Sequence, residues 1–433
     1  MAEPFAYNGL VMKFQKPRGT QDILPSEQRY WFWVEDNFRE TMLSAGFGRI
    51  IIPTFEDTGL FTRGVGEATD IVSKEMYTFK DRGGNSITLR PEGTAGVARA
   101  YIEHGMHKEP QPIKLFYFGP MFRYGRPQAG RFREFYQAGT ELFGELDPTT
   151  DAQMVAVMVK FYRKLGLKDL VVHVNSIGDA RSRVKVNKAL VDFLSAHRRK
   201  LCNDCKNRMT KNPLRALDCK EKSCQPVMEE AGSILLDHLT PDSRDYFTKV
   251  LEYLDDMGVH YELDPRLVRG LDYYTHTVFE VFSKNNSNSL GGGGRYDGLV
   301  KLLGGLDTPA VGFAIGVERT IEVLKQQAVA IPEVESSDLF VVQLGDEAKK
   351  KAIKIISQLD DAGYKTAHAL GRGSIKSQLR VADRLKTKFA VIIGEREVHD
   401  GNVIIRDLSD GTQEAVLDRD LLKRIQKRLK ERK

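Results

Sequence analysis

The chain has 433 residues, which is too long for one hydrophobic core, so we expect roughly three domains. Hydrophobic residues make up 41% of it and charged residues 29%; these ordinary globular values exclude disordered, collagen-like and disulfide-scaffold proteins. The net charge of +6 permits an anionic partner without requiring one. We find neither a run of about 18 apolar residues nor an N-terminal targeting segment, so we expect a cytoplasmic protein without a membrane part.

The first half of the chain predicts a helix followed by irregularly spaced strands. A helical pattern opens at Ser26 and stops at Gly46, because apolar residues recur every fourth position between them. Residues 49–53 then predict a short strand closed by proline, which is best tolerated at a strand end. β-Branched and aromatic residues predict further strands at 87–90, 114–118, 132–143, 171–175 and 277–282.

The last part of the chain alternates strands and helices. Strands are predicted at 339–344, 364–370, 389–393 and 403–406, and helices at 346–362, 374–385 and the basic C-terminus. This β-α-β-α-β-β-α order predicts an autonomous α/β domain of about 100 residues. The basic last helix is either a solvated face or a surface for an anionic partner.

All four cysteines fall within one short stretch, at Cys202, Cys205, Cys219 and Cys224. Four thiolates could hold a tetrahedral zinc ion, but the second pair is more widely spaced than the usual two-residue gap. We favour reduced surface thiols over a structural zinc ion or a disulfide. In each case the cluster is structural, and we predict no metal ligand in the catalytic site.

Two segments carry groups suited to a polar ligand. Glu92, Gly93 and Thr94 follow a strand and precede a helix, so a carboxylate, a turn and a hydroxyl converge as an ammonium group requires. The alternative is that they only cap the helix. In the strand 132–143, Arg133, Phe135, Gln137, Gly139 and Glu141 share one face, because side chains alternate along a strand. So dense a polar row is better explained by a ligand than by the core.

Other segments carry arginines and glycines that also suit a polar ligand. A basic loop at 124–131 joins two predicted strands, and Arg269 lies beside Tyr273 and Tyr274. The glycines at 291–294 let the main chain approach a ligand closely, and Arg319 falls in the first turns of a helix after a strand. Neither a phosphate-binding P-loop nor a dinucleotide-binding fingerprint is present.

These motifs resemble those of a known enzyme family. Residues 51–53, 122–141 and 316–319 resemble, in order and spacing, the three motifs of class II aminoacyl-tRNA synthetases. Residues 269–274, 293–298 and 16–22 resemble signatures of the histidyl-tRNA synthetase family of bacterial type. Residues 371–379 are similar to that family's anticodon-binding domain, so the resemblance covers nearly the whole chain.

The resemblance implies both an activity and an architecture. The activity is ATP-dependent activation of L-histidine, with Mg²⁺, and transfer of histidine to the 3′ end of tRNA(His) by a homodimer. The implied fold is an α+β catalytic domain with an antiparallel sheet, a helical insertion and a C-terminal α/β anticodon-binding domain with a mixed sheet. Its boundaries are expected at 1–179 and 260–325 for the catalytic domain, 180–259 for the insertion, 326–336 for a linker and 337–433 for the anticodon-binding domain.

The resemblance also assigns roles residue by residue. Histidine binding falls to Glu92, Gly93, Thr94, Gln137, Glu141, Tyr273 and Tyr274, with Glu141 and Tyr274 facing the imidazole. ATP binding falls to Arg123, Arg131, Phe135 and Arg319, catalysis to Arg269 and Arg123, and the tRNA acceptor end to Arg126 and Gln128. Position 125 is glycine where the class usually has glutamate, so main-chain atoms or a water would replace that adenine contact.

The alternative is a synthetase-like regulatory subunit of ATP phosphoribosyltransferase in histidine biosynthesis. Such paralogues resemble the catalytic domain but lack the anticodon-binding domain and typically lose catalytic motif residues. This chain keeps the C-terminal domain as well as Arg123, Arg269 and Arg319, and we therefore favour the synthetase.

Overall fold

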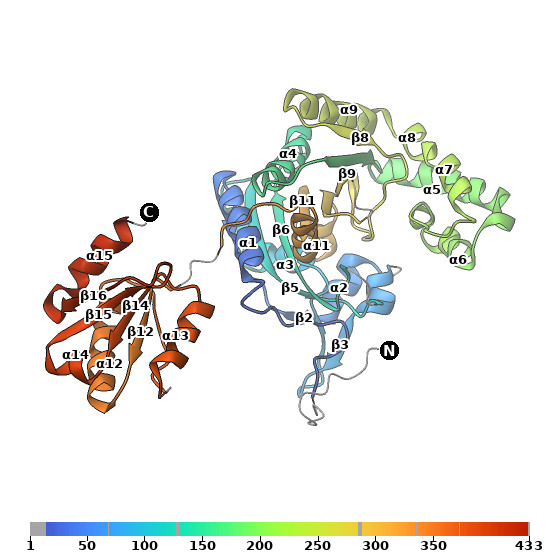
Figure 1. The fold of residues 1–433 in the computed structure, drawn as a ribbon. Coiled ribbons are helices and arrows are strands. Elements are labelled where there is room, and N and C mark those ends of the chain that lie inside the picture. The colour runs from blue at the N-terminus through green and yellow to red at the C-terminus, as the bar shows by residue number, and fades with distance from the viewer. Residues whose placement is uncertain are drawn as a thin grey trace. The chain divides into compact units, whose positions relative to one another are not determined.

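The computed structural model describes residues 14–67, 69–126, 130–284, 288–333, 337–371 and 373–431. The chain divides into two compact units, Met1–Pro332 and Glu333–Lys433, and the second holds the orange-to-red end of the colour range in Figure 1. Each unit has hydrophobic clusters of its own. Among the described residues, no helix combines the length and apolar character needed to cross a membrane.

An eight-stranded sheet is the centre of the first unit. In spatial order its strands are β1 (Gly48–Arg49), β5 (Ile113–Phe122), β6 (Glu134–Phe143), β11 (Ala310–Gly316), β10 (Gly291–Arg295), β9 (Thr275–Ser283), β7 (Leu170–Ser176) and β8 (Tyr261–Leu263). Neighbours from β5 to β7 are antiparallel, and only the two edge pairings are parallel. The predicted α+β catalytic domain with an antiparallel sheet is therefore confirmed.

Helices and a small second sheet cover this central sheet (Figure 1). The helices before the insertion are α1 (Gln28–Ser44), α2 (Thr58–Val65), α3 (Thr94–Glu103) and α4 (Pro148–Lys164), with the short η1 (Ile71–Glu75) and η2 (Met106–Lys108). The small sheet has the order β2 (Phe55–Asp57), β4 (Ser86–Leu89) and β3 (Tyr77–Lys80), and α10 (Leu299–Leu302) and α11 (Val317–Gln326) follow later in the chain. Side chains of α1, α4 and α11 share one buried cluster with those of β6, β9 and β11.

The predicted helical insertion lies between β7 and β8. Its elements are α5 (Ala180–Ala196), η3 (Arg198–Lys200), α6 (Asn203–Lys211), η4 (Pro213–Ala216), α7 (Gln225–Ala231), α8 (Ser233–Asp237) and α9 (Pro241–Asp256). Asp179 and Thr240 accept backbone N–H bonds at the starts of α5 and α9, which explains why these helices begin where they do.

The second unit has a five-stranded mixed sheet. Its order is β13 (Thr366–His368), β12 (Leu339–Gln343), β14 (Phe389–Ile393), β15 (Asn402–Asp407) and β16 (Gln413–Leu417), and its helices are α12 (Asp346–Asp361), α13 (Ile375–Arg384), α14 (Glu395–His399) and α15 (Leu421–Glu431), with η5 (Asp418–Asp420). β12 is parallel to β13 and β14, whereas β14, β15 and β16 pair antiparallel. The predicted mixed sheet is confirmed.

The structure differs from the predicted elements at several strands. The strand expected at 49–53 is only two residues long: Ile50 still donates its N–H to the Phe116 carbonyl at 2.8 Å, but residues 51–53 leave the sheet. β10 was not predicted, because four consecutive glycines disfavour a strand in isolation. β16 and α14 were also missed, since both are only five residues long and mostly exposed or half-buried.

A buried ion pair ties β10 to α4. The Arg295 guanidinium and the Asp151 carboxylate are both fully buried, and Arg295 Nη2 lies 2.6 Å from Asp151 Oδ1. The remaining guanidinium donors reach Thr150 Oγ1 at 2.7 Å and the Glu145 carbonyl and Asp297 Oδ1 at 3.0 Å each. A desolvated guanidinium tolerates burial only when its donors are satisfied in this way.

We expect Asp151→Ala to lower the free energy of unfolding of the first unit by about 3–5 kcal/mol, because it removes the fully buried carboxylate partner of Arg295 and leaves only the partly exposed Asp297 to compensate the guanidinium. Both tryptophans, Trp31 and Trp33, lie in α1, so urea unfolding followed by tryptophan fluorescence reports on this unit. Asp307→Ala is the matched control, since it removes a carboxylate from an ion pair with Lys301 that is mostly exposed. If both variants lost a similar amount of unfolding free energy, the buried Arg295–Asp151 pair would not be more important for stability than an exposed pair.

Candidate active site

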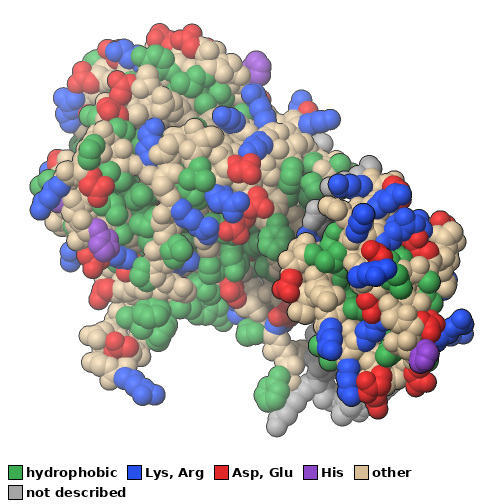
Figure 2. Space-filling view, turned by 90° about the vertical axis from the view of Figure 1, so that its left-hand side faces the viewer, with side chains coloured by type: hydrophobic (Ala, Val, Ile, Leu, Met, Phe, Trp, Pro, Cys, Tyr) green, Lys and Arg blue, Asp and Glu red, His purple; other side chains and the backbone are tan. Residues whose placement is uncertain are grey.

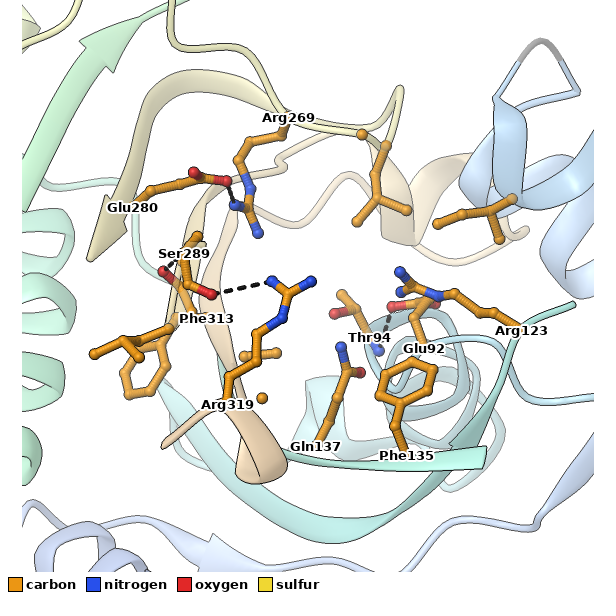
Figure 3. A pocket seen from close by; sticks show the side chains of 18 of the residues that line it. Glu92, Thr94, Arg123, Phe135, Gln137, Arg269, Glu280, Ser289, Phe313 and Arg319 are labelled. Atoms are coloured by element: carbon orange, nitrogen blue, oxygen red, sulfur yellow. Dashed lines mark hydrogen bonds and ion pairs between the residues drawn. The ribbon is translucent and has the colours of Figure 1, made fainter. Parts of the chain in front are cut away.

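A cavity of about 290 Å³ opens on the central sheet of the first unit. Side chains from β5, β6, the loop 269–274 and α11 line it, together with the start of α3. One wall is main chain, because it is formed by Gly291 and Gly292 of β10 and Gly312, Ala314 and Gly316 of β11. Figure 3 shows the guanidinium groups of Arg123, Arg269 and Arg319 approaching the same space from three different segments.

Hydrogen-bond acceptors gather at one end of the cavity. The Glu92 carboxylate accepts the N–H groups of Thr94 at 2.7 Å and Ala95 at 2.9 Å, at the start of α3. Glu141 lies below it, where its carboxylate accepts the Thr94 hydroxyl at 2.7 Å and the Tyr296 hydroxyl. Gln137 lines the cavity, and its buried Oε1 has no hydrogen-bond partner within the described part of the chain.

Glycines provide the space that these buried groups occupy. A Cβ atom on Gly312 would collide with the Glu141 carboxylate, and one on Gly93 or Gly139 would collide with the Tyr117 ring. None of these three glycines has a positive φ. They are therefore required by close packing and not by backbone conformation.

The buried carboxylates have altered acidity. Burial raises the pKa of Glu141 to about 8, an effect that its hydrogen bonds to Tyr296 and Thr94 reduce and the nearby Glu92 increases. Burial likewise raises the pKa of Glu92. Neither carboxylate forms an ion pair among the described residues, so a cationic ligand would stabilise their charged forms.

The arginines are held by partners that leave them facing the cavity. Arg269 pairs with Glu280; burial alone would lower the pKa of Arg269, but Glu280 and Tyr274 together raise it above its ordinary value. Arg123 donates from Nε to the Pro91 carbonyl at 2.7 Å, and burial lowers the pKa of its guanidinium.

The remaining arginines of the cavity are fixed in a similar way. Arg319 donates from Nη1 to the Ser289 carbonyl at 3.0 Å, and Arg131 pairs with Glu75. Each guanidinium thus keeps its position and its charge without a bound ligand.

The structure brings most of the predicted site residues together around this cavity. Of the predicted residues, those that line the cavity are Glu92, Thr94, Arg123, Arg131, Phe135, Gln137, Arg269, Tyr273, Tyr274 and Arg319. Gly93 is the N-cap residue of α3, and the buried Glu141 is hydrogen-bonded to Thr94 and Tyr296, which line the cavity. Arg133, predicted to share their face, instead stacks on Tyr124 with its guanidinium 3.8 Å from the ring centre.

The loop 124–131 is described only in part. Arg126 is exposed, and Gln128 lies outside the described residues. Gly125 is close to Arg131, because a Cβ atom at that position would lie 2.9 Å from Arg131 Nε. A larger residue at 125 would therefore require Arg131 to move.

Sequence reasoning missed several residues of the cavity. Tyr117, Glu280 and Glu318 line it, and Tyr296 hydrogen-bonds the buried Glu141. Tyr296 belongs to a segment already singled out at 293–298, but Tyr117 sits inside a strand with nothing to distinguish it from a core aromatic. Burial raises the pKa of Glu318 to about 7, and its carboxylate accepts the Tyr136 N–H at 3.0 Å.

The pKa of Glu141 generates a prediction about pH. Between the ordinary glutamate value and about 8, the folded state keeps a proton that the unfolded state releases, so the free energy of unfolding falls as pH rises. Glu141→Gln cannot ionise. We expect its stability relative to the unsubstituted protein to increase from about pH 5 to pH 8, measured by urea unfolding with tryptophan fluorescence.

Glu103→Gln is the control for that experiment, because the Glu103 side chain is 61% exposed. It should follow the unsubstituted protein at every pH. A Glu141→Gln stability difference that stays constant across this range would contradict the raised pKa.

Comparisons with known proteins match the chain along almost its whole length. A family model described as histidyl-tRNA synthetase matches residues 19–320, and one described as anticodon binding domain matches residues 338–428. A histidine–tRNA ligase of Pelotomaculum thermopropionicum is 47% identical over 403 residues, 93% of this chain and 95% of that protein.

Solved structures give the same result. Apo S. aureus histidyl-tRNA synthetase superposes with a TM-score of 0.79 at 39% identity, covering 95% of this chain and 99% of that one. A structure from Bacillus halodurans described as an ATP phosphoribosyltransferase regulatory subunit/histidyl-tRNA synthetase has a TM-score of 0.65, covering 88% of this chain and 99% of that one, at 21% identity. At that identity the likeness concerns the fold alone.

Proposed function

The chain belongs to the histidyl-tRNA synthetase family, and from this premise we propose which residues of the cavity carry out the reaction. The protein is a histidine–tRNA ligase: it activates histidine with ATP and attaches it to tRNA. The regulatory-subunit alternative is supported only by a distant match.

One observation carries the assignment of the site: hydrogen-bond acceptors and guanidinium groups come together at the same cavity (Figure 3). Glu92, the Oε1 atom of Gln137 and, through Thr94, the buried Glu141 offer acceptors, whereas the half-buried Arg123 and Arg269 offer positive charge. Histidine carries an ammonium group and an imidazole that need acceptors, and a carboxylate that needs positive charge. A zwitterionic amino acid satisfies both sets at once.

We assign the α-ammonium group of histidine to Glu92, Gln137 and Thr94. We also assign Gly93, in the turn before α3, and Tyr273, in the cavity lining, to histidine binding. The Tyr273 hydroxyl already reaches Glu92 Oε2 at 3.5 Å. We assign the imidazole to Glu141 and Tyr274. A buried carboxylate that needs an N–H partner disfavours amino acids without one, because such analogues leave it unpaired.

We assign the histidine carboxylate and the ATP α-phosphate to Arg123 and Arg269. A carboxylate oxygen attacks the α-phosphorus in line, the new P–O bond forms, and the bond to pyrophosphate breaks. No protein nucleophile is needed, so the arginines act by stabilising charge on the equatorial oxygens. Phe135 is assigned to the adenine ring, and Arg131 and Arg319 to the distal phosphates.

Mg²⁺ would arrive with ATP and would supply positive charge to the leaving pyrophosphate. Glu280 and Glu318 line the same cavity and would offer it carboxylate oxygens, the ligand type that Mg²⁺ prefers, although Glu280 also pairs with Arg269 and Glu318 accepts the Tyr136 N–H. In the second step the terminal ribose hydroxyl of tRNA attacks the activated carbonyl and AMP leaves, and we assign the acceptor end to Arg126 and Gln128.

The second unit is assigned to the anticodon side of tRNA, in line with its family match. Figure 2 shows Lys and Arg side chains gathered on this unit. In α15, Arg424 and Arg428 pair with Glu414, whereas Lys423, Lys427 and Lys430 are exposed. Lys427 also lies 3.8 Å from the exposed Glu431 carboxylate, a weak surface pair that a phosphate group could replace.

A homodimer and a cytoplasmic location complete the proposal. β1 forms an edge of the central sheet, and next to it the apolar side chains of Ile51 and Phe55 are 83% and 55% exposed. Exposed apolar clusters of this kind mark protein interfaces, so we place the second copy there. We propose a cytoplasmic location because the protein acts on tRNA.

Arg269→Ala tests the catalytic assignment. We expect the rate of histidyl-adenylate formation to fall by about 10²–10³-fold, because the charge is needed mainly in the transition state, while the dissociation constant for histidine changes far less. Pre-steady-state adenylate formation and calorimetry measure the two quantities. Arg266→Ala, in the same loop but outside the cavity lining, should retain the full rate.

Replacing Lys423, Lys427 and Lys430 together with glutamine tests the anticodon assignment. We expect weaker tRNA binding and a smaller slope of log affinity against log salt, by roughly 0.7–0.9 for each phosphate that the lysines no longer neutralise. Histidine-dependent pyrophosphate exchange should be unchanged. The same replacement at Lys349, Lys350 and Lys354 of α12 is the control, and an equal effect there would contradict a role specific to α15.

A further inference from the structure

The four cysteines of the insertion converge on one point, although they are spread over 23 positions of the chain. The Sγ atoms of Cys202, Cys205, Cys219 and Cys224 all lie within 4.8 Å of one another. Three of these residues are buried, and Cys202 is half-buried. The first pair flanks the start of α6 and the second flanks the turn before α7.

The distances discriminate between the chemical states of such a cluster. All four cysteines are free of disulfides, and Cys202 Sγ lies 3.9 Å from Cys219 Sγ, far beyond the S–S bond of about 2.05 Å. Sulfurs placed about 2.3 Å from one tetrahedral zinc ion would be about 3.8 Å apart. The cluster has the size of a single-ion site and is too compact for a multi-iron cluster.

Backbone N–H groups stabilise negative sulfur at Cys202 and Cys224. The Cys202 N–H donates to Cys224 Sγ at 3.2 Å, and the Cys205 N–H donates to Cys202 Sγ at 3.4 Å. Cys202 is also the N-cap of α6, where the helix dipole stabilises a negative charge. Amide donors directed at sulfur are the outer contacts that a thiolate ligand set requires.

We propose that these four cysteines hold one structural zinc ion as a tetrathiolate site. On binding, Zn²⁺ displaces the four thiol protons, and no electron transfer is involved. The gaps of two and four residues within the pairs both fall in the range used by structural zinc sites. The wider second gap, which made zinc unattractive from sequence alone, is accommodated by the turn before α7.

The proposed metal also fixes a segment that supports the catalytic loop. Between the two cysteine pairs, Asn212 joins α6 to η4, and η4 carries Arg215. Asn212 Nδ2 donates to Asp272 Oδ1 at 2.7 Å, and Arg215 Nη1 donates to the Arg269 carbonyl at 3.0 Å. We therefore infer that the zinc site positions Arg269, an inference that rests on the catalytic role proposed above for that residue.

Metal content of the purified full-length protein tests the site directly. We expect one zinc per chain by elemental analysis, and thiolate-to-metal charge-transfer absorption from tetrahedral Co²⁺ when cobalt replaces zinc. Cys219→Ser should lose the metal, whereas Ser223→Ala, beside Cys224 but without a thiol, should keep it. The site would be overturned if the unsubstituted protein were folded but contained no zinc and bound no cobalt, or if it contained iron instead. These results do not depend on whether Cys219→Ser folds.

Metal removal tests the positioning of Arg269. After chelation of the full-length dimer, we expect adenylate formation to slow by about 10–100-fold, the scale of a small displacement of a reacting group, and to recover when zinc is added back. Circular dichroism checks that the remaining helices persist. Asn212→Ala should slow adenylate formation while retaining zinc. If zinc were lost without any change in the rate of adenylate formation, the positioning role would be overturned but the zinc site would stand. The zinc measurement tests the site by itself, because it does not depend on the proposed catalytic role of Arg269.

Discussion

The structure of the candidate active site depends on the burial of the Glu92 and Glu141 carboxylates. Both are almost fully buried, and a buried carboxylate costs several kcal/mol unless donors surround it. The donors here are the start of α3 around Glu92, and the hydroxyls of Thr94 and Tyr296 around Glu141. These groups come from segments far apart in the chain, so the fold of the whole first unit is needed to make two acidic groups tolerable in the absence of substrate.

The same constraint applies to the arginines of the cavity. Each has a partner of its own: Glu280 for Arg269, and main-chain carbonyls for Arg123 and Arg319. These contacts fix the guanidinium groups before a ligand arrives, so less reorganisation is left for the reaction itself. Binding and catalysis then depend on a rigid arrangement of charge and not on a residue that changes its covalent state.

The sequence was sufficient to predict residues whose chemistry is unusual for a strand or a helix. Gln137 and Glu141 stood out because a polar row on one face of a strand needs an explanation, Glu92 because polar groups converge between a strand and a helix, and Arg269 because it lies beside two tyrosines; the structure brings all four to the cavity or into contact with its lining. Tyr117 and Glu280 could not be predicted, since their role depends on which strands pair. β10 was missed for the opposite reason: its strand conformation is imposed by β9 and β11 and not by its own glycines.

The main-chain wall formed by β10 and β11 limits how this enzyme can evolve. A side chain added at Gly292 would meet Arg269 Nη1 at 2.8 Å and the main chain of β9, and one at Gly293 would strike β11. A wall without side chains has no rotamers to rearrange, and single substitutions cannot reshape it without separating the strands. If the proposed site residues bind the substrate, a change of amino-acid specificity is therefore accessible only through the opposite wall, whose side chains can be exchanged one at a time.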